Sequence, residues 1–174
     1  MASATGVPVE EYLKTTYEPD REYVDGQLVE RHVGEYFHSR LQTMVGTLLS
    51  NREDERGFLT FTEQRVKVSE SPRYRIPDIC VKALPHEITP VLERPDLAIE
   101  IVSPDDAPIE MTEKIVEYLA SGIPYVWVVD PYRREKIVAD QQGIRVPPTW
   151  TFETPLVGPV DFGALLEKLY RHSR

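Results

Sequence analysis

The ten residues PDLAIEIVSP, numbers 95–104, form a short apolar run with a glutamate in its middle. Alternation of side chains along a β-strand places Glu100 on the same face as Ala98 and Val102, opposite the apolar side chains between them. A carboxylate that is buried without a partner costs several kcal/mol or more. Glu100 therefore needs a cation or hydrogen-bond donors inside the fold, unless its strand has an exposed face.

A strand–helix–strand unit begins with this run and ends near residue 130. Gly122 and Pro124 stand where a helix would end, and PYVWVVD, residues 124–130, is typical of a strand covered on both faces. The unit predicts two parallel strands with a right-handed crossover. Five residues at three- and four-residue steps predict the buried stripe of the helix: Ile109, Thr112, Ile115, Val116 and Leu119.

The flanking segments predict a mixed sheet with further helices. Asp25-Gly26 within EYVDGQLVE, residues 22–30, indicates a hairpin, and an apolar stripe over residues 34–52 indicates an amphipathic helix. The length of 174 residues fits one domain, residues 1–174, with an α/β arrangement of a mixed β-sheet flanked by helices. Further segments are expected as follows: a short helix at 9–16, an alternating strand at 58–68, a strand at 76–82, an edge strand at 150–153 and a closing helix at 162–170.

The composition limits where the protein works and what it contacts. Acidic residues number 29 against 20 basic ones, and the net charge of −9 opposes binding to an indiscriminate polyanion. Any contact with nucleic acid must therefore be confined to a small part of the protein surface. The single Cys80 agrees with a reducing compartment. Because the sequence has neither a signal-peptide pattern nor a membrane-spanning apolar segment, we expect a cytoplasmic protein with no membrane contact.

Two carboxylates are candidates for a metal site. Asp78, in RIPDICV, is expected to lie at the start of the strand beside the one carrying Glu100. Close like charges do not ionise together unless a cation holds them, and a hard divalent ion such as magnesium prefers oxygen ligands. Lys114 on the following helix could reach Glu100, and Tyr118 lies one turn further along. An ammonium beside a metal-bound water and a phosphate would stabilise developing negative charge.

Together these motifs resemble a known family. RIPDICV, PDLAIEIVSP, the pattern K-x-x-x-Y-x-x-x-G-I-P from residue 114 to residue 124, and YVWVVDP are similar to the Uma-type family of predicted endonucleases, within the PD-(D/E)XK superfamily. The resemblance extends upstream to EYVDGQLVE and His38. It implies a restriction-endonuclease-like fold, an α/β arrangement with a mixed β-sheet flanked by helices. It also implies a DNA endonuclease that depends on Mg²⁺, with Mn²⁺ as a substitute, and that forms a homodimer. The residues it implies are Asp78, Glu100 and the carbonyl of Ile101 as metal ligands, Lys114 as a catalytic residue, and His38, Tyr118 and Glu22 as secondary candidates.

One position departs from the superfamily pattern. The lysine usually stands two residues after the acidic residue, where this chain has Val102. The Uma-type pattern instead takes the lysine from the next helix, which Lys114 matches. The displaced lysine and the net charge leave open a second function, a non-catalytic binding or assembly module with an unused pocket. A third is hydrolysis of a smaller phosphodiester, which needs less basic surface than a duplex.

The residues alone also permit structural interpretations. Glu100 could pair with Arg75, Asp78 could belong to a turn, and Lys114 could be a solvated residue paired with Glu110 or Tyr118. His38 could serve in packing or capping. Basic residues concentrate in two clusters that are candidates for phosphate contacts. The first cluster is Arg133, Arg134 and Lys136, and it is also typical of a polar hairpin tip. The second cluster is Arg65, Lys67, Arg73 and Arg75.

Overall fold

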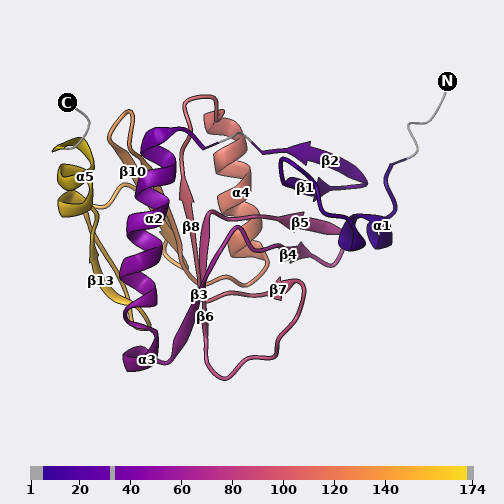
Figure 1. Ribbon diagram of the computed structural model, residues 1–174, viewed down its shortest axis with the longest axis horizontal. Helices are drawn as coiled ribbons and strands as arrows, with labels where there is room; N and C mark the ends of the chain where they lie inside the picture. Colours follow the sequence, from indigo (N-terminus) through magenta and orange to yellow (C-terminus); the bar gives the residue numbers. More distant parts are fainter. Residues whose placement is uncertain (1–5, 32–33, 172–174) are drawn as a thin grey trace.

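The computed structural model describes residues 6–31 and 34–171 and is built around a six-stranded mixed sheet (Figure 1). Its two middle strands are parallel, and one of them pairs antiparallel with the strand on its other side. The parallel pair confirms the strand–helix–strand unit. In spatial order the strands are β11 (Gly143–Arg145), β10 (Glu135–Asp140), β9 (Val126–Asp130), β8 (Leu97–Ile101), β6 (Ile79–Ala83) and β3 (Phe58–Thr62).

Strand β8 is buried along its whole length and faces a different core on each side. Leu97 and Ile99 belong to the core under α2 (Tyr36–Ser50) and α5 (Phe162–Arg171), whereas Ala98 belongs to the core under α4 (Pro108–Ala120). Figure 1 shows α2 and α4 on either side of β8. The alternation expected from the sequence is confirmed, and Glu100 points toward α4.

A second sheet is built mainly from the N-terminal half of the chain and packs beside α4 (Figure 1). Tyr12 on the short helix α1 (Val9–Lys14) stacks on Tyr23 and Tyr74, which anchors the helix to this sheet. Both residues of the Asp25-Gly26 turn have positive φ, so the predicted hairpin is confirmed. The strand order is β2 (Gln27–Glu30), β1 (Arg21–Val24), β5 (Arg73–Arg75), β4 (Val66–Ser69) and β7 (Leu92–Glu93).

Three expectations about strands and turns are corrected or refined. The alternating segment 58–68 is not one strand: Glu63 has a φ of +53°, the chain turns there, and β3 and β4 lie in different sheets. The segment near residue 150 joins neither large sheet, because β12 (Thr151–Thr154) pairs only with β13 (Gly158–Asp161). A one-turn helix, α3 (Glu53–Arg56), was not expected. The closing helix is confirmed as α5.

The predicted stripe of α4 is confirmed at Ile115 and Leu119 and is wrong at Ile109, Thr112 and Val116. Ile109 and Val116 are 68% and 53% exposed, while the buried face consists of Met111, Ile115 and Tyr118. The pattern misled because a tyrosine was not counted as a core residue, although the Tyr118 ring is fully buried. Its hydroxyl finds a partner that lies far away in sequence. Among the described residues, none of the helices has both the length and the apolar character needed to cross a bilayer.

The revised face of α4 predicts opposite outcomes for two isoleucines of one helix. Ile115→Ala should lower the free energy of unfolding by about 2–5 kcal/mol, because it leaves a cavity in the core. Ile109→Ala should change it by about 0.5 kcal/mol or less, since that side chain is mostly in water. Urea denaturation followed by circular dichroism measures both. Similar losses in the two variants would contradict the assigned face.

Candidate active site

One cavity of about 230 Å³ contains nearly all the residues singled out from the sequence. It opens beside the end of β8, between the β1–β2 hairpin and the N-terminal half of α4. Tyr118 is the one predicted site residue that does not line the cavity, and it contacts a residue that does. The predicted residues on the wall are Glu22, His38, Asp78, Glu100, Ile101 and Lys114.

Asp78 directly precedes β6, and hydrogen bonds fix both of its carboxylate oxygens. The backbone N–H of Ile101 donates to Oδ2 at 2.7 Å, while Arg31 Nη2 and His38 Nε2 lie 2.7 and 3.2 Å from Oδ1. Burial alone would raise the pKa of this carboxyl, but His38, Arg31 and the Ile101 N–H outweigh burial and lower it. Asp78 is therefore held ionised at neutral pH.

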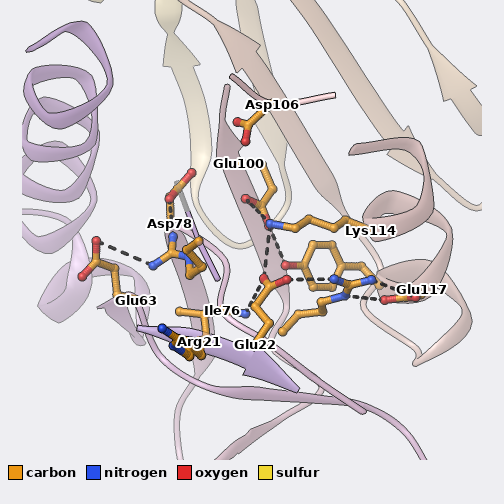
Figure 2. A network of polar contacts seen from close by, with 12 residues as sticks. Arg21, Glu22, Glu63, Ile76, Asp78, Glu100, Asp106, Lys114 and Glu117 are labelled. Carbon is orange, nitrogen blue, oxygen red and sulfur yellow. Dashed lines mark hydrogen bonds and ion pairs between the residues drawn. The ribbon is translucent and has the colours of Figure 1, made fainter. Parts of the chain in front are cut away.

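Glu100 has a different environment. The Tyr118 hydroxyl donates to its Oε1 at 2.5 Å, and Lys114 Nζ lies 3.7 Å from its Oε2 (Figure 2). Burial, together with the neighbouring charges of Asp78 and Glu22, raises the pKa of Glu100 to about 7, although Lys114 opposes the shift. Oε2 is the less firmly bound oxygen. It is consequently the atom that a cation in the cavity can reach at the lowest cost.

Lys114 extends from α4 into the space between two carboxylates (Figure 2). Its ammonium is 3.2 Å from Glu22 Oε1, closer than to Glu100. Burial would lower the pKa of Lys114, but the acids around it, Glu100 first and then Glu22 and Asp78, raise it above its usual range. The lysine is therefore a permanent cation at neutral pH and cannot act there as a proton acceptor.

Glu22 is anchored from the second sheet and is only 1% exposed. It accepts hydrogen bonds from Arg75 Nη1 at 2.8 Å and from the Ile76 backbone N–H at 3.1 Å. Arg75 also donates to Glu117 on α4. Despite burial, the charges of Lys114 and Arg75 lower the pKa of Glu22. This ionic network joins β1, β5 and α4 behind the cavity.

Several structural interpretations are now excluded. Arg75 does not pair with Glu100 but with Glu22 and Glu117, and Lys114 faces carboxylates from two other elements rather than Glu110 or Tyr118. His38 contacts Asp78 and does not cap its helix. The second basic cluster has internal partners in place of phosphates: Arg65 donates to backbone carbonyls near α1, Lys67 pairs with Glu70, and both Arg73 and Arg75 pair with Glu117.

Sequence reasoning missed Arg31, which follows β2 and forms the closest ion pair of Asp78. Burial would lower the pKa of Arg31, but Asp78 and Glu100 raise it, so it remains charged. No local pattern marks it, because its partner lies 47 residues away. The hairpin signal at Asp25-Gly26 could have drawn attention to it, since that hairpin also carries Glu22.

The cavity offers two carboxylates, which are ligands of the kind that a hard divalent cation prefers. Among residues 6–31 and 34–171, which the structure describes, no group of three or more His, Cys, Asp or Glu side chains is spaced to hold a metal ion. Asp78 and Glu100 nevertheless line one cavity, and Ile101 lies against Asp78 through its N–H. Magnesium is commonly bound by one or two carboxylates with water completing the shell. The Asp78–Arg31 ion pair is the feature that competes with such an ion.

Comparison with known proteins gives the site its family context. Residues 9–157 match the model of the Uma2 family, which is described as "Putative restriction endonuclease". The chain belongs to the Uma2 family. The resemblance read from the sequence is thereby confirmed. No curated protein matches the chain.

One solved structure supports the fold of this Uma2 protein. A crystal structure of "a putative nuclease belonging to DUF820" from Anabaena variabilis ATCC 29413 is 26% identical, with a TM-score of 0.80 over 94% of this chain and 99% of that chain. The restriction-endonuclease-like α/β fold expected from the sequence is confirmed by this similarity. A DrdV–DNA complex, seen by electron cryomicroscopy, is 17% identical, with a TM-score of 0.41 over 78% of this chain and 13% of that chain, too weak a similarity for any inference.

The environment of Glu100 predicts a pH-dependent stability. Its pKa of about 7 lies above the ordinary 4.5, so the folded protein binds this proton more tightly than the unfolded chain does. Stability should therefore fall as the pH rises from about 4.5 to about 7. Glu100→Gln keeps an acceptor for Tyr118 but cannot titrate. Its free energy of unfolding should therefore fall by roughly 1 to 3 kcal/mol less than that of the wild type over this pH range.

Urea denaturation of wild type and variant across that pH range tests the prediction. Glu70→Gln is the matched control, because the Glu70 side chain is 93% exposed and its loss should leave the pH profile unchanged. Parallel profiles for wild type and Glu100→Gln would contradict the raised pKa.

The ionic network predicts unequal roles for two acids of the same hairpin. Glu22→Gln removes a buried charge that faces Arg75 and Lys114, and such a change costs about 3–5 kcal/mol. Glu30→Gln removes a 59%-exposed partner of Arg21 and should cost about 1 kcal/mol or less. Thermal and urea unfolding at neutral pH measure both. If the two variants were equally stable, Glu22 would not anchor the network.

Proposed function

We propose that the protein is a magnesium-dependent endonuclease that hydrolyses phosphodiester bonds in DNA, with manganese as a substitute. The observation that carries this proposal is the position of Lys114, whose ammonium comes from the next helix to within 3.7 Å of Glu100. Asp78 lines the same cavity. The cavity thus contains an amine and two acids, although the usual lysine position, two residues after the acidic residue, is occupied by Val102.

The proposed metal ligands are Asp78, Glu100 and the carbonyl of Ile101. A bound magnesium ion would supply Lewis acidity toward a phosphoryl oxygen and would lower the pKa of a bound water. Hydrogen bonds already orient the two carboxylates: Ile101 N–H and His38 hold Asp78, and Tyr118 holds Glu100. Such hydrogen bonds orient the ligands of a metal, and Arg31 would have to give up its ion pair with Asp78 when an ion binds.

Lys114 is proposed to stabilise negative charge on the phosphate and on the attacking oxygen. A largely buried cation acts more strongly on a nearby charge than one in solution does. Its raised pKa argues against a role as general base. Glu22 holds the ammonium on the side away from Glu100, and we assign it a positioning role.

Three wider features complete the proposal. DNA is the substrate, a homodimer is the working assembly, since symmetric dimers are the commonest oligomers, and the cytoplasm is the location. The reduced, buried Cys80 is consistent with that compartment.

The enzymatic proposal predicts that cleavage depends on two residues. In magnesium, Glu100→Ala should abolish cleavage of plasmid and linear DNA, and Lys114→Ala should lower its rate by about 100-fold or more, because each removes stabilisation of developing charge. Glu70→Gln and Lys168→Ala remove the same charges from exposed positions and should retain wild-type rates. Circular dichroism confirms folding. Equal rates for wild type and Glu100→Ala would refute the proposal.

A second function, a non-catalytic binding or assembly module, is favoured by one observation. Arg31 already neutralises Asp78 at 2.7 Å, as a structural site without a metal would require. Calorimetric titration with magnesium and manganese separates the two functions. The enzyme should bind either ion, and Asp78→Asn should bind neither; no binding at millimolar metal, together with no cleavage, would favour the module.

A further inference from the structure

An arginine–aromatic surface lies beside the cavity and is not used by the proposed chemistry. We define it by residues of the first turns of α2, the β9–β10 turn and the end of α5. Phe37 is its centre, with ring centroids at 5.6 Å from Tyr36, 5.4 Å from Tyr132 and 5.6 Å from Tyr170, all edge to face. The members are Tyr36, Phe37, Arg40, Tyr132, Arg134 and Tyr170.

Tyr36 is unusual in its exposure. It is 55% exposed and is the one exposed aromatic side chain within the described segments, 6–31 and 34–171. The Phe37 ring supports it from below, so the phenol is presented on a rigid base. An exposed aromatic ring held in this way offers a flat face on which a planar ligand can stack.

Two exposed arginines, Arg40 and Arg134, belong to the same surface. Arg40 stands four residues after Tyr36 on α2, so both lie on the same side of the helix. The Arg134 guanidinium lies 4.4 Å from the centre of the Tyr170 ring. These positions combine cations with π-faces in a chain whose net charge is −9.

The surface adjoins the candidate active site along α2. His38 follows Phe37 directly, lines the cavity and contacts Asp78 there. A flexible strand with its phosphate in the cavity could therefore continue past His38 toward Tyr36.

We propose that the arginine–aromatic surface binds unpaired nucleotides next to the phosphate to be cleaved, so that the preferred substrate is single-stranded nucleic acid. This inference rests on the proposed function and narrows its substrate. Stacking of bases on aromatic rings, with arginines near the backbone, is how proteins bind single strands without reading their sequence. In an intact duplex the bases are paired and stacked on each other, so their faces are not accessible for stacking on Tyr36.

The charges of the surface favour stacking over a purely electrostatic contact. Two acids, Glu35 and Glu135, lie in the same segments, and both are exposed. These two acids balance the charges of Arg40 and Arg134, so the rings are expected to supply most of the affinity. Salt dependence then distinguishes the two kinds of residue, because only a phosphate contact releases counterions.

The test measures fluorescence anisotropy of a labelled oligo-dT strand and of a hairpin duplex, in EDTA and again in calcium. Wild type should prefer the single strand. Tyr36→Ala should weaken that binding about tenfold, and Tyr36→Phe should restore it, since phenylalanine also stacks. Arg134→Ala should reduce the slope of log affinity against log salt by about 0.7, whereas Tyr36→Ala should leave it unchanged.

Two substitutions on the far side of β10 serve as controls. Arg145→Ala removes an exposed arginine, and Val146→Ala removes a 73%-exposed apolar side chain, so neither should change binding. Equal affinity for duplex and single strand, or no effect of Tyr36→Ala, would overturn the inference. So would an absence of binding to either probe.

Sedimentation and cleavage assays complete the test. If Tyr36→Ala instead dissociated a dimer, the surface would be an interface between copies, and the inference would fail. Cleavage that persists without any dependence on Tyr36 would overturn this inference alone. Binding that depends on Tyr36 in a protein that cleaves nothing would support the surface and overturn the endonuclease.

Discussion

The burial of Glu100 is the constraint on which the rest of the structure depends. A carboxylate in the middle of a fully buried strand has a high cost unless donors and a cation surround it. Tyr118 and Lys114 supply them from one face of α4, and this requirement sets the rotation of the helix. The apolar side chains of Ile109 and Val116 are left in solvent as a result.

The same requirement explains why the N-terminal sheet packs against α4. Lys114 faces Glu22 as well as Glu100, and Glu22 in turn receives Arg75 and the Ile76 N–H. Each buried acid in this part of the molecule therefore has a cation from another element. The cavity is the space left where these elements meet, and its polar wall follows from the ion pairs that close the fold.

Much of this arrangement could be predicted from the chain alone, because its signals are local. Alternation in PDLAIEIVSP gave the face of Glu100, Asp25-Gly26 gave the hairpin, and the apolar run before Asp130 gave the parallel partner. The break at Glu63 was not predicted because it is a backbone conformation, and the buried ring of Tyr118 was not predicted because its acceptor lies elsewhere in the chain. Arg31 was not predicted because its partner, Asp78, is 47 residues away.

The ion pairs also have a consequence for how the protein is made. Glu22 and Arg75 are 53 residues apart, and their network is complete only when Glu117 and Lys114 on α4 have joined it. A nascent chain that has emerged only as far as β6 thus lacks Lys114, the second cation that faces Glu22, and Glu117, the second acid that faces Arg75. The two sheets cannot reach their final packing one after the other during translation, and the finished molecule should open and close as a single cooperative unit.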